Sequence, residues 1–323
     1  MKTPISNKKG VALILVLLMV SVIVVLTLQL NVSSRSQVHE AANLGDGIRV
    51  LYIAKSGLFA GMGLLSEDRG NADTLNEDWA RTEALSEQSK DYFDGGHLEL
   101  VIEDETGKVN INKLVEGNGF NNAVKGVLSR LLTQPQFKLQ DREVEDLLNA
   151  IKDWIDADAE VTATGAENAY YQGLGRSYTV RNGPMESIDE LLLVRGVSRE
   201  LFHGTSERPG LARFLTVQGE GSININTAPK EVLQALAPSI TEDAANRMDD
   251  YRRNAANNLT EPSWYRRVSG LQNTAIDSVT VTTKSEYFQI AATGHLGTMK
   301  RTIRGIVKRD SEKKLSVVAW RLG

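Results

Sequence analysis

The 323-residue chain has no cysteine, only four histidines, and 6% aromatic residues. Without cysteine it can form no disulfide, bind no metal through a thiolate, and carry out no thiol chemistry. The histidines (His39, His97, His203 and His295) are scattered, and none stands at the spacing of a His-Glu-x-x-His metal motif. A Gly-x-Ser-x-Gly motif and a phosphate-binding loop are also missing. These absences predict a protein that is not an enzyme.

Acidic residues are absent from the N-terminal region, where Glu40 is the first. Lys8, Lys9 and Gly10 directly precede a stretch without charge that runs from residue 11 to residue 34. Twenty apolar residues at about 1.5 Å each cross a hydrocarbon core of about 30 Å. The segment alone allows three interpretations: a signal anchor, a prepilin-like leader cut after Gly10, or a secretory signal, whose apolar core is usually shorter. The basic N-terminus is expected to stay cytoplasmic while the chain after Arg35 is exported.

The helical pattern continues beyond the apolar run. Apolar residues recur at steps of three and four, which predicts one long helix or two abutting helices from residue 11 to about 66, about 80 Å if continuous. A helix that is half apolar and half amphipathic is typical of a pilin spine. The amphipathic half is expected to pack on its own sheet and then on partner helices, through Val38, Ile48, Leu51, Leu58 and Met62.

The rest of the chain alternates helices and short strands. Residues 97–102 read as a strand, residues 122–158 as helices, and residues 187–202 as two short helices opened by a Ser187/Glu190 capping box. Near the C-terminus, residues 279–281, 287–291 and 299–309 alternate like antiparallel strands. The basic residues of the last segment are expected on the exposed face of edge strands, and they are Lys300, Arg301, Arg304, Lys308 and Arg309.

One short motif occurs twice, 114 residues apart. Val109-Asn110-Ile111-Asn112 returns as Ile223-Asn224-Ile225-Asn226, each after an acidic, glycine-containing turn. Each copy opens a helical segment, so two related helical units are predicted in tandem. In the second unit Thr227 is expected to cap the helix, with Pro229 in its first turn.

Acidic residues gather where the predicted helices of residues 122–158 end. Asp156, Asp158 and Glu160 alternate, and Glu167 is twelfth counting from Asp156. Carboxylates at positions 1, 3, 5 and 12 of a loop can converge on calcium, with the carbonyl of Thr162 at position seven as a further ligand. Val161 stands where an EF-hand has glycine, so the loop is not a true EF-hand. The competing interpretation is that these acids are solvated residues after a helix.

Taken together, these features resemble the minor pseudopilin K family of type II secretion systems. The resemblance covers nearly the whole chain; its most specific parts are Lys9-Gly10 and the segments 107–112 and 153–158, and further matches include 190–196 and 224–229. It implies an α+β, pilin-like fold with an inserted helical region of two SAM-like units. The expected divisions are a leader (1–10), a transmembrane helix (11–34), the first part of the pilin-like domain (35–103), two SAM-like units (104–218 and 219–276) and C-terminal pilin-like strands (277–323).

The resemblance also implies a place in the cell and a set of partners. The prepilin peptidase would cut after Gly10 and Val11 would be N-methylated, leaving a single-pass inner-membrane protein of a Gram-negative bacterium with periplasmic domains. The partners would be minor pseudopilins I and J, major pseudopilin G and the inner-membrane secretion platform, and a structural calcium ion is expected in the acidic loop. The fifth mature residue is Leu15, where most pilins carry glutamate, and this points to the fibre tip.

Two other functions compete with this interpretation. One is a membrane-anchored helix-hairpin-helix DNA receptor of a competence system, and the other is a minor pilin of a type IV pilus. The segment 237–240 lacks the Gly-x-Gly hairpin that cradles phosphates, and the charge around residues 189–200 is mixed. We therefore expect no nucleic-acid binding.

Overall fold

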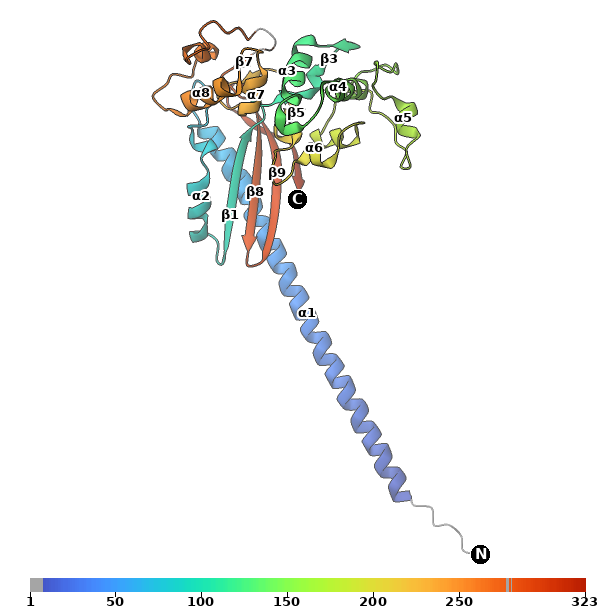
Figure 1. Cartoon of the computed structure of the whole chain (residues 1–323). Coiled ribbons are helices and arrows are strands. Elements are labelled where there is room, and N and C mark those ends of the chain that lie inside the picture. Colours follow the sequence, from blue (N-terminus) through green and yellow to red (C-terminus); the bar gives the residue numbers. More distant parts are fainter. Residues whose placement is uncertain (1–7, 277–278, 280) are drawn as a thin grey trace, which may run out of the picture.

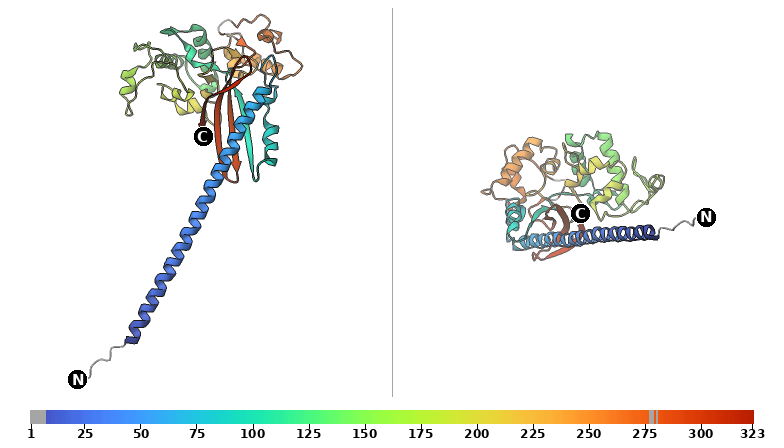
Figure 2. Two further views of the ribbon diagram at one scale, coloured as in Figure 1. Left: turned by 180° about the vertical axis from the view of Figure 1, so that it is seen from behind. Right: turned by 90° about the horizontal axis from the view of Figure 1, so that it is seen from below.

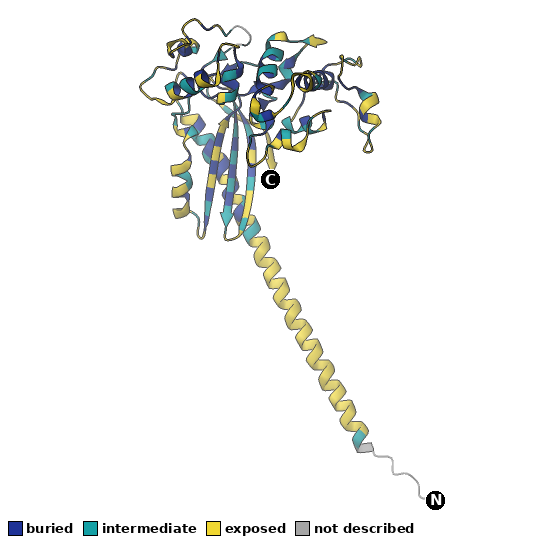
Figure 3. Ribbon diagram, in the orientation of Figure 1, coloured by how far each residue is buried: buried dark blue, intermediate teal, exposed yellow. Residues whose placement is uncertain are grey.

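The computed structural model describes residues 8–276, 279 and 281–323. The first seven residues of the expected leader lie outside this range. Helix α1 (Lys8–Glu67) is a single 60-residue helix, which confirms one long spine rather than two abutting helices. Its N-terminal part projects alone from the rest of the molecule, and residues 11–45 are exposed (Figures 1 and 3).

The C-terminal part of α1 covers one face of a four-stranded antiparallel sheet (Figures 1 and 2). The sheet order is β1 (Gly96–Asp104), β8 (Tyr287–Leu296), β9 (Met299–Arg309), β10 (Leu315–Leu322). Alternate residues of β1 and β8, among them Leu98, Leu100, Phe288 and Ile290, are buried toward the helix. Gly57 permits this packing, because a Cβ there would lie 2.3 Å from Cδ1 of Leu98.

A short helical segment covers the outer edge of β1. It comprises η1 (Asp78–Ala80), α2 (Glu83–Gln88) and η2 (Ser89–Asp91). The hydroxyl of Ser89 accepts a hydrogen bond from the Leu98 N–H at 2.8 Å, and the hydroxyl of Ser86 accepts one from the Leu100 N–H at 3.1 Å. These side chains satisfy backbone groups that an edge strand would otherwise leave open.

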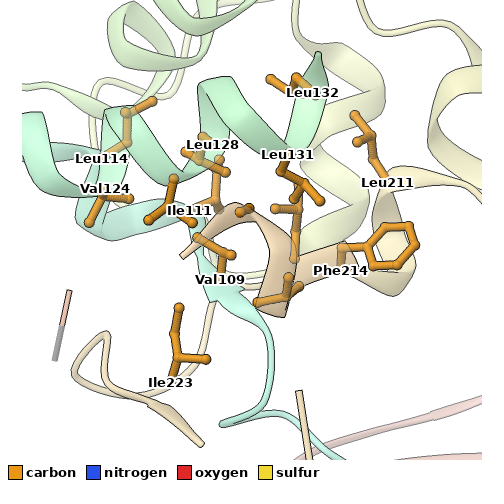
Figure 4. Close-up of a cluster of buried hydrophobic side chains, with 14 of the residues drawn as sticks. Val109, Ile111, Leu114, Val124, Leu128, Leu131, Leu132, Leu211, Phe214 and Ile223 are labelled. Atoms are coloured by element: carbon orange, nitrogen blue, oxygen red, sulfur yellow. The ribbon is translucent and has the colours of Figure 1, made fainter. Parts of the chain in front are cut away.

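The helical region between β1 and β8 lies at the end of the sheet far from the N-terminus of α1 (Figure 1). Its first unit contains β2 (Val109–Asn110), η3 (Ile111–Leu114), β3 (Val115–Glu116), β4 (Gly119–Phe120), α3 (Asn122–Leu132), η4 (Pro135–Phe137), α4 (Asp141–Ile155), α5 (Asn168–Gln172), η5 (Ile188–Leu193), α6 (Arg199–His203), η6 (Leu211–Arg213) and β5 (Leu215–Thr216). The second contains β6 (Ile223–Asn224), α7 (Lys230–Ala235), α8 (Glu242–Arg253), η7 (Pro262–Arg267) and β7 (Val281–Thr282). The two units share one core of buried aliphatic and aromatic side chains, part of which Figure 4 shows.

Both copies of the repeated motif open with a short strand that pairs in parallel with the strand closing the same unit. Strand β2 pairs with β5, and β6 pairs with β7. The expectation that Val281 belongs to the antiparallel sheet is therefore wrong, because its partner is Ile223. Thr280, the residue before it, lies outside the described residues.

The asparagines of the repeat explain why the motif occurs twice. The side-chain oxygens of Asn110 and Asn224 accept the N–H of the residue two positions later, at 3.0 and 2.9 Å. Asn112 and Asn226 tie the start of each unit to distant backbone, donating to the carbonyls of Met185 (2.9 Å) and Leu259 (3.1 Å). The motif is thus a buried hydrogen-bonding element of the fold.

The predicted role of Thr227 is wrong. Helix α7 has Pro229 at its N-cap and no side-chain cap. The Thr227 hydroxyl instead donates to Asp104, a buried carboxylate at the end of β1 that also accepts from Asn224 and Ser285. This network joins the second unit to the sheet.

Candidate metal centre and assembly surface

The acidic loop begins where α4 ends. Asp156 is the C-cap of α4 and Glu167 is the N-cap of α5, so the loop brings these two positions together. One carboxylate oxygen from each of Asp156, Asp158 and Glu167 lies within 4.8 Å of the others. The three carboxylates therefore form a compact cluster.

Several oxygens of this cluster are buried without a hydrogen-bond partner among the described residues. They are Oδ1 of Asp156 and both carboxylate oxygens of Glu167. Oδ1 of Asn182 is in the same condition, and the amide group of Asn182 donates to the Asp158 carbonyl at 2.6 Å. A buried oxygen that accepts no hydrogen bond lowers the stability of the folded state, and a bound cation is one way to satisfy it.

The local charge also favours a cation. Burial raises the pKa of Glu167 to about 7, with the Asp153 carboxylate adding to the effect. Lys152 is the cation bonded to the cluster, through Asp156 and the Thr162 hydroxyl (2.9 Å). The donors are all oxygens, which suits a hard cation such as calcium, with water completing its six to eight ligands.

One predicted ligand, Glu160, is not in the cluster, and the other, the Thr162 carbonyl, already accepts a hydrogen bond. Glu160 is exposed, and its backbone N–H donates to Asp158 at 2.9 Å. The carbonyl of Thr162 already accepts the Gly165 N–H at 2.7 Å. Position five, Glu160, is therefore exposed and lies outside the cluster formed by positions one, three and twelve.

Two contributing residues escaped sequence reasoning. Asp153, fully buried in α4, accepts the Thr162 N–H at 3.1 Å and so holds the loop against the helix. A Cβ at Gly165 would lie 2.0 Å from Oδ2 of Asp153, which requires glycine there. Asn182 reaches the cluster from a later loop, and no motif around it in the sequence indicates this.

A second acidic cluster consists of Asp68, Asp73 and Glu77, which follow α1. The guanidinium of Arg309 pairs with Asp68 at 2.8 Å and with Asp73, and its side chain is only 5% exposed. The prediction that Arg309 lies on an exposed face is therefore wrong. Burial raises the pKa of Glu77 to about 7. Here an arginine occupies the place that a metal ion would take.

The helix residues predicted to contact partners divide into two groups. Leu58 is buried against the sheet, because a Cβ at Gly305 would lie 2.8 Å from its Cδ1. Leu51 and Met62 are half-buried, whereas Ile48 and Val38 are 49% and 65% exposed. Leu58 is thus fully buried in the chain's own core and Leu51 and Met62 pack against that core in part, whereas Ile48 and Val38 remain exposed.

Strand β10 extends the apolar surface beside α1. Trp320 (61% exposed) and Val317 (42%) pair in register with Gly305 and Val307, whose face of the sheet α1 covers. We call the residues Ile48, Leu51, Met62, Val317 and Trp320 the helix–strand surface. Exposed apolar residues gathered on one side of a spine helix are typical of a protein interface.

Comparison with known proteins places the chain in a family. A family model described as "Type II secretion system (T2SS), protein K" matches residues 107–207, and a second model with the same description matches residues 223–283; together they span about half of the chain. The chain belongs to the type II secretion system protein K family. The protein K of Aeromonas hydrophila is 27% identical over 267 residues, covering 77% of this chain and 76% of the relative. That of Pseudomonas aeruginosa is 26% identical over 257 residues, covering 79% and 72%.

A solved structure shares the fold. It is the GspK-GspI-GspJ complex from the type 2 secretion system of enterotoxigenic Escherichia coli, with a TM-score of 0.71, 16% identity, and coverage of 88% of this chain and 99% of that one. The match confirms the long helix and antiparallel sheet of the predicted pilin-like fold. Membership of the protein K family makes the chain a minor pseudopilin, a structural component of the secretion apparatus, and does not favour the DNA-receptor or type IV pilus alternatives.

Proposed function

We propose that this protein K caps the tip of the periplasmic pseudopilus together with minor pseudopilins I and J. The observation that carries the proposal is the position of the helical region, which sits at the end of the sheet farthest from the N-terminus of α1 (Figure 1). Bulk at that end would clash within a packed helical fibre but not at its tip. Leu15, in place of the usual pilin glutamate, supports the same position, since a subunit without it lacks the attraction to a neighbour's terminal amine.

The N-terminal segment supplies the anchor in this proposal. The prepilin peptidase cuts after Gly10, Val11 is methylated, and α1 holds the protein in the inner membrane beside major pseudopilin G and the secretion platform. Support comes from the hydropathy of the helix, whose most apolar 18-residue window is exposed throughout. The mass of the mature N-terminus from a host with the peptidase tests this step; an intact Met1 would contradict it.

The helical region is proposed to consist of two SAM-like units stabilised by calcium. The repeated asparagine motif and the paired opening and closing strands support two related units. The three orphaned oxygens of Asp156 and Glu167 support a structural ion, which Asp156, Asp158, Glu167 and Asn182 would hold. The ion would fix the loop between α4 and α5.

The helix–strand surface is the proposed contact with the other minor pseudopilins. The test co-expresses the full chain with I and J and measures complex yield after purification in detergent. Trp320→Asp is expected to weaken the complex at least about tenfold, because a large exposed aromatic residue is a typical interface hot spot. Tyr92→Asp, at an 81% exposed position before β1, is the matched control. Equal complex yield from both variants would contradict the proposed surface.

A further inference from the structure

Two of the four histidines meet on the sheet. His97 of β1 and His295 of β8 are direct register partners, and their imidazole rings stack with centroids 4.4 Å apart and planes 1° from parallel. The neighbouring Leu98 is buried toward α1, so the two histidines lie on the opposite face of the sheet. The two histidines are far apart in the sequence, so the sequence analysis did not predict this pair.

A carboxylate completes a group of three possible ligands. Glu99 follows His97 by two positions in β1 and so points to the same face. Its Oε2 lies 3.4 Å from Nε2 of His295. The His295 side chain is 27% exposed and that of Glu99 is 62% exposed, so an ion could enter from solvent.

We propose that His97, Glu99 and His295 form a binding site for a divalent transition metal of the zinc class. Directly opposed residues in antiparallel strands have Cβ atoms about 4.5–5.5 Å apart, so modest side-chain rotation brings both imidazoles onto one ion. Zinc binds imidazole nitrogen at about 2.0–2.1 Å and carboxylate oxygen at about 2.0–2.2 Å, usually with four ligands. Three ligands from the chain leave one position for water.

Ligand chemistry separates this site from the acidic loop. The loop offers only oxygens, which suit calcium, whereas imidazole suits zinc, copper and nickel. The two backbones that present the histidines are hydrogen-bonded strands, which limits how far the ligands can drift apart. Lys300 is the register partner of His295 on β9, and its positive charge lowers the affinity of the site for a cation.

The test titrates zinc chloride into the full chain in detergent micelles, with excess calcium present so that the acidic loop cannot contribute. Calorimetry is expected to show one zinc ion per chain, with saturable binding lost in His97→Gln and in His295→Gln. His39→Gln, on the exposed part of α1, removes a histidine elsewhere and should bind as the wild type does. Lys300→Met should tighten binding about two- to fivefold, the effect of a nearby surface charge.

A measurement on the wild type guards against variants that fail to fold. Imidazole NMR resonances of His97 and His295 are expected to shift together at one equivalent of zinc, while those of His39 and His203 stay in place. Absence of saturable zinc binding, binding unchanged in both histidine variants, or no shift at His97 and His295 would each overturn the proposal.

Discussion

The two acidic clusters of this protein have similar composition but differ in how fully basic side chains of the chain itself pair with them. In the first cluster, which also contains Glu77, the buried guanidinium of Arg309 pairs with Asp68 and Asp73, and the Lys313 ammonium lies 3.7 Å from Asp68. The other cluster, Asp156, Asp158 and Glu167, is bonded to one lysine and retains unpartnered buried oxygens. Three carboxylates in proximity therefore do not by themselves define a metal site; what matters is whether the fold delivers its own cation.

The two clusters differ in which segment of the chain supplies the basic side chain. Arg309 reaches the first cluster because β9 ends beside the segment that follows α1, although the two are far apart in sequence. The second cluster receives Lys152 from the last turn of α4, which pairs with Asp156 and leaves Oδ1 of Asp156 and both oxygens of Glu167 without a partner among the described residues. The first cluster is thus paired with cations of the chain itself, whereas the second keeps unpartnered buried oxygens, which supports the proposed ion.

Removing the internal cation should have the largest effect. Arg309→Met leaves Asp68 and Asp73 buried without compensation, which costs about 3–5 kcal/mol. Urea unfolding of the full chain in detergent measures the loss of stability. Calcium should restore part of that stability, because the cluster without Arg309 then resembles the acidic loop between α4 and α5. Lys90→Met, which breaks an exposed pair with Glu87, should cost less than about 1 kcal/mol. Equal losses of unfolding free energy in the two variants would contradict a larger contribution from the buried pair.

Calcium should stabilise the wild type through the second cluster. At a hundredfold excess over its dissociation constant, a ligand that binds only the folded state adds about 2.7 kcal/mol. Asp158→Ala should abolish this gain in a thermal unfolding assay. Glu160→Ala should retain it, because the Glu160 side chain is not in the cluster. Loss of the calcium-dependent gain in both variants would mean that Glu160 is also a ligand, as the EF-hand-like spacing in the sequence suggested.

A smaller effect is expected from the support of that loop. Gly165→Ala places a Cβ against Asp153, and overpacking of this kind costs about 1–3 kcal/mol. The calcium-dependent gain should shrink as well, since Asp153 positions the loop. Gly175→Ala, where a Cβ would meet nothing within 4 Å, should leave both quantities unchanged. The idea fails if the two substitutions behave alike in unfolding and calcium titration.

The smallest effect concerns the pH dependence of the first cluster. The folded pKa of Glu77 is about 7, above its ordinary 4.5, so the folded state holds a proton that the unfolded state releases. The resulting stabilisation is complete below pH 4.5 and is lost as pH rises to about 7. Glu77→Gln keeps an oxygen for the Trp79 and Thr74 N–H groups and should be more stable than the wild type by about 1–2 kcal/mol above pH 7.

The control for that experiment is Asp78→Asn, which removes a negative charge at an exposed neighbouring position. Unfolding free energies of the three proteins, followed from pH 4.5 to 8, give the comparison. A constant difference between Glu77→Gln and the wild type over this range would show that Glu77 titrates normally.

Local patterns were sufficient for much of the fold. The spine helix, α3, α4 and the Ser187/Glu190 capping box follow from apolar periodicity and capping residues, which act over a few neighbouring positions. The same holds for β8 and β9, whose alternation is clear. Val281 was assigned to the wrong sheet because two residues carry no information about which strand will pair with them.

The candidate sites needed more than local patterns. Asp156, Asp158 and Glu167 could be proposed from spacing alone, since one loop connects them. Asn182, the closure of the first cluster by Arg309, and the meeting of His97 with His295 depend on contacts between distant segments. Spacing also misplaced Glu160, because loop conformation and not residue count decides which side chains converge.

The sequence by itself determined an apolar spine with a basic start, two copies of an asparagine motif, and a set of acidic residues after a helix. These are properties of neighbouring residues, where side-chain preference and helical geometry suffice. Only the tertiary structure decided which acids keep a partner, which lose one, and which two histidines stack. Those outcomes depend on strand register and on the burial of charge, and both arise when segments far apart in the chain are packed together.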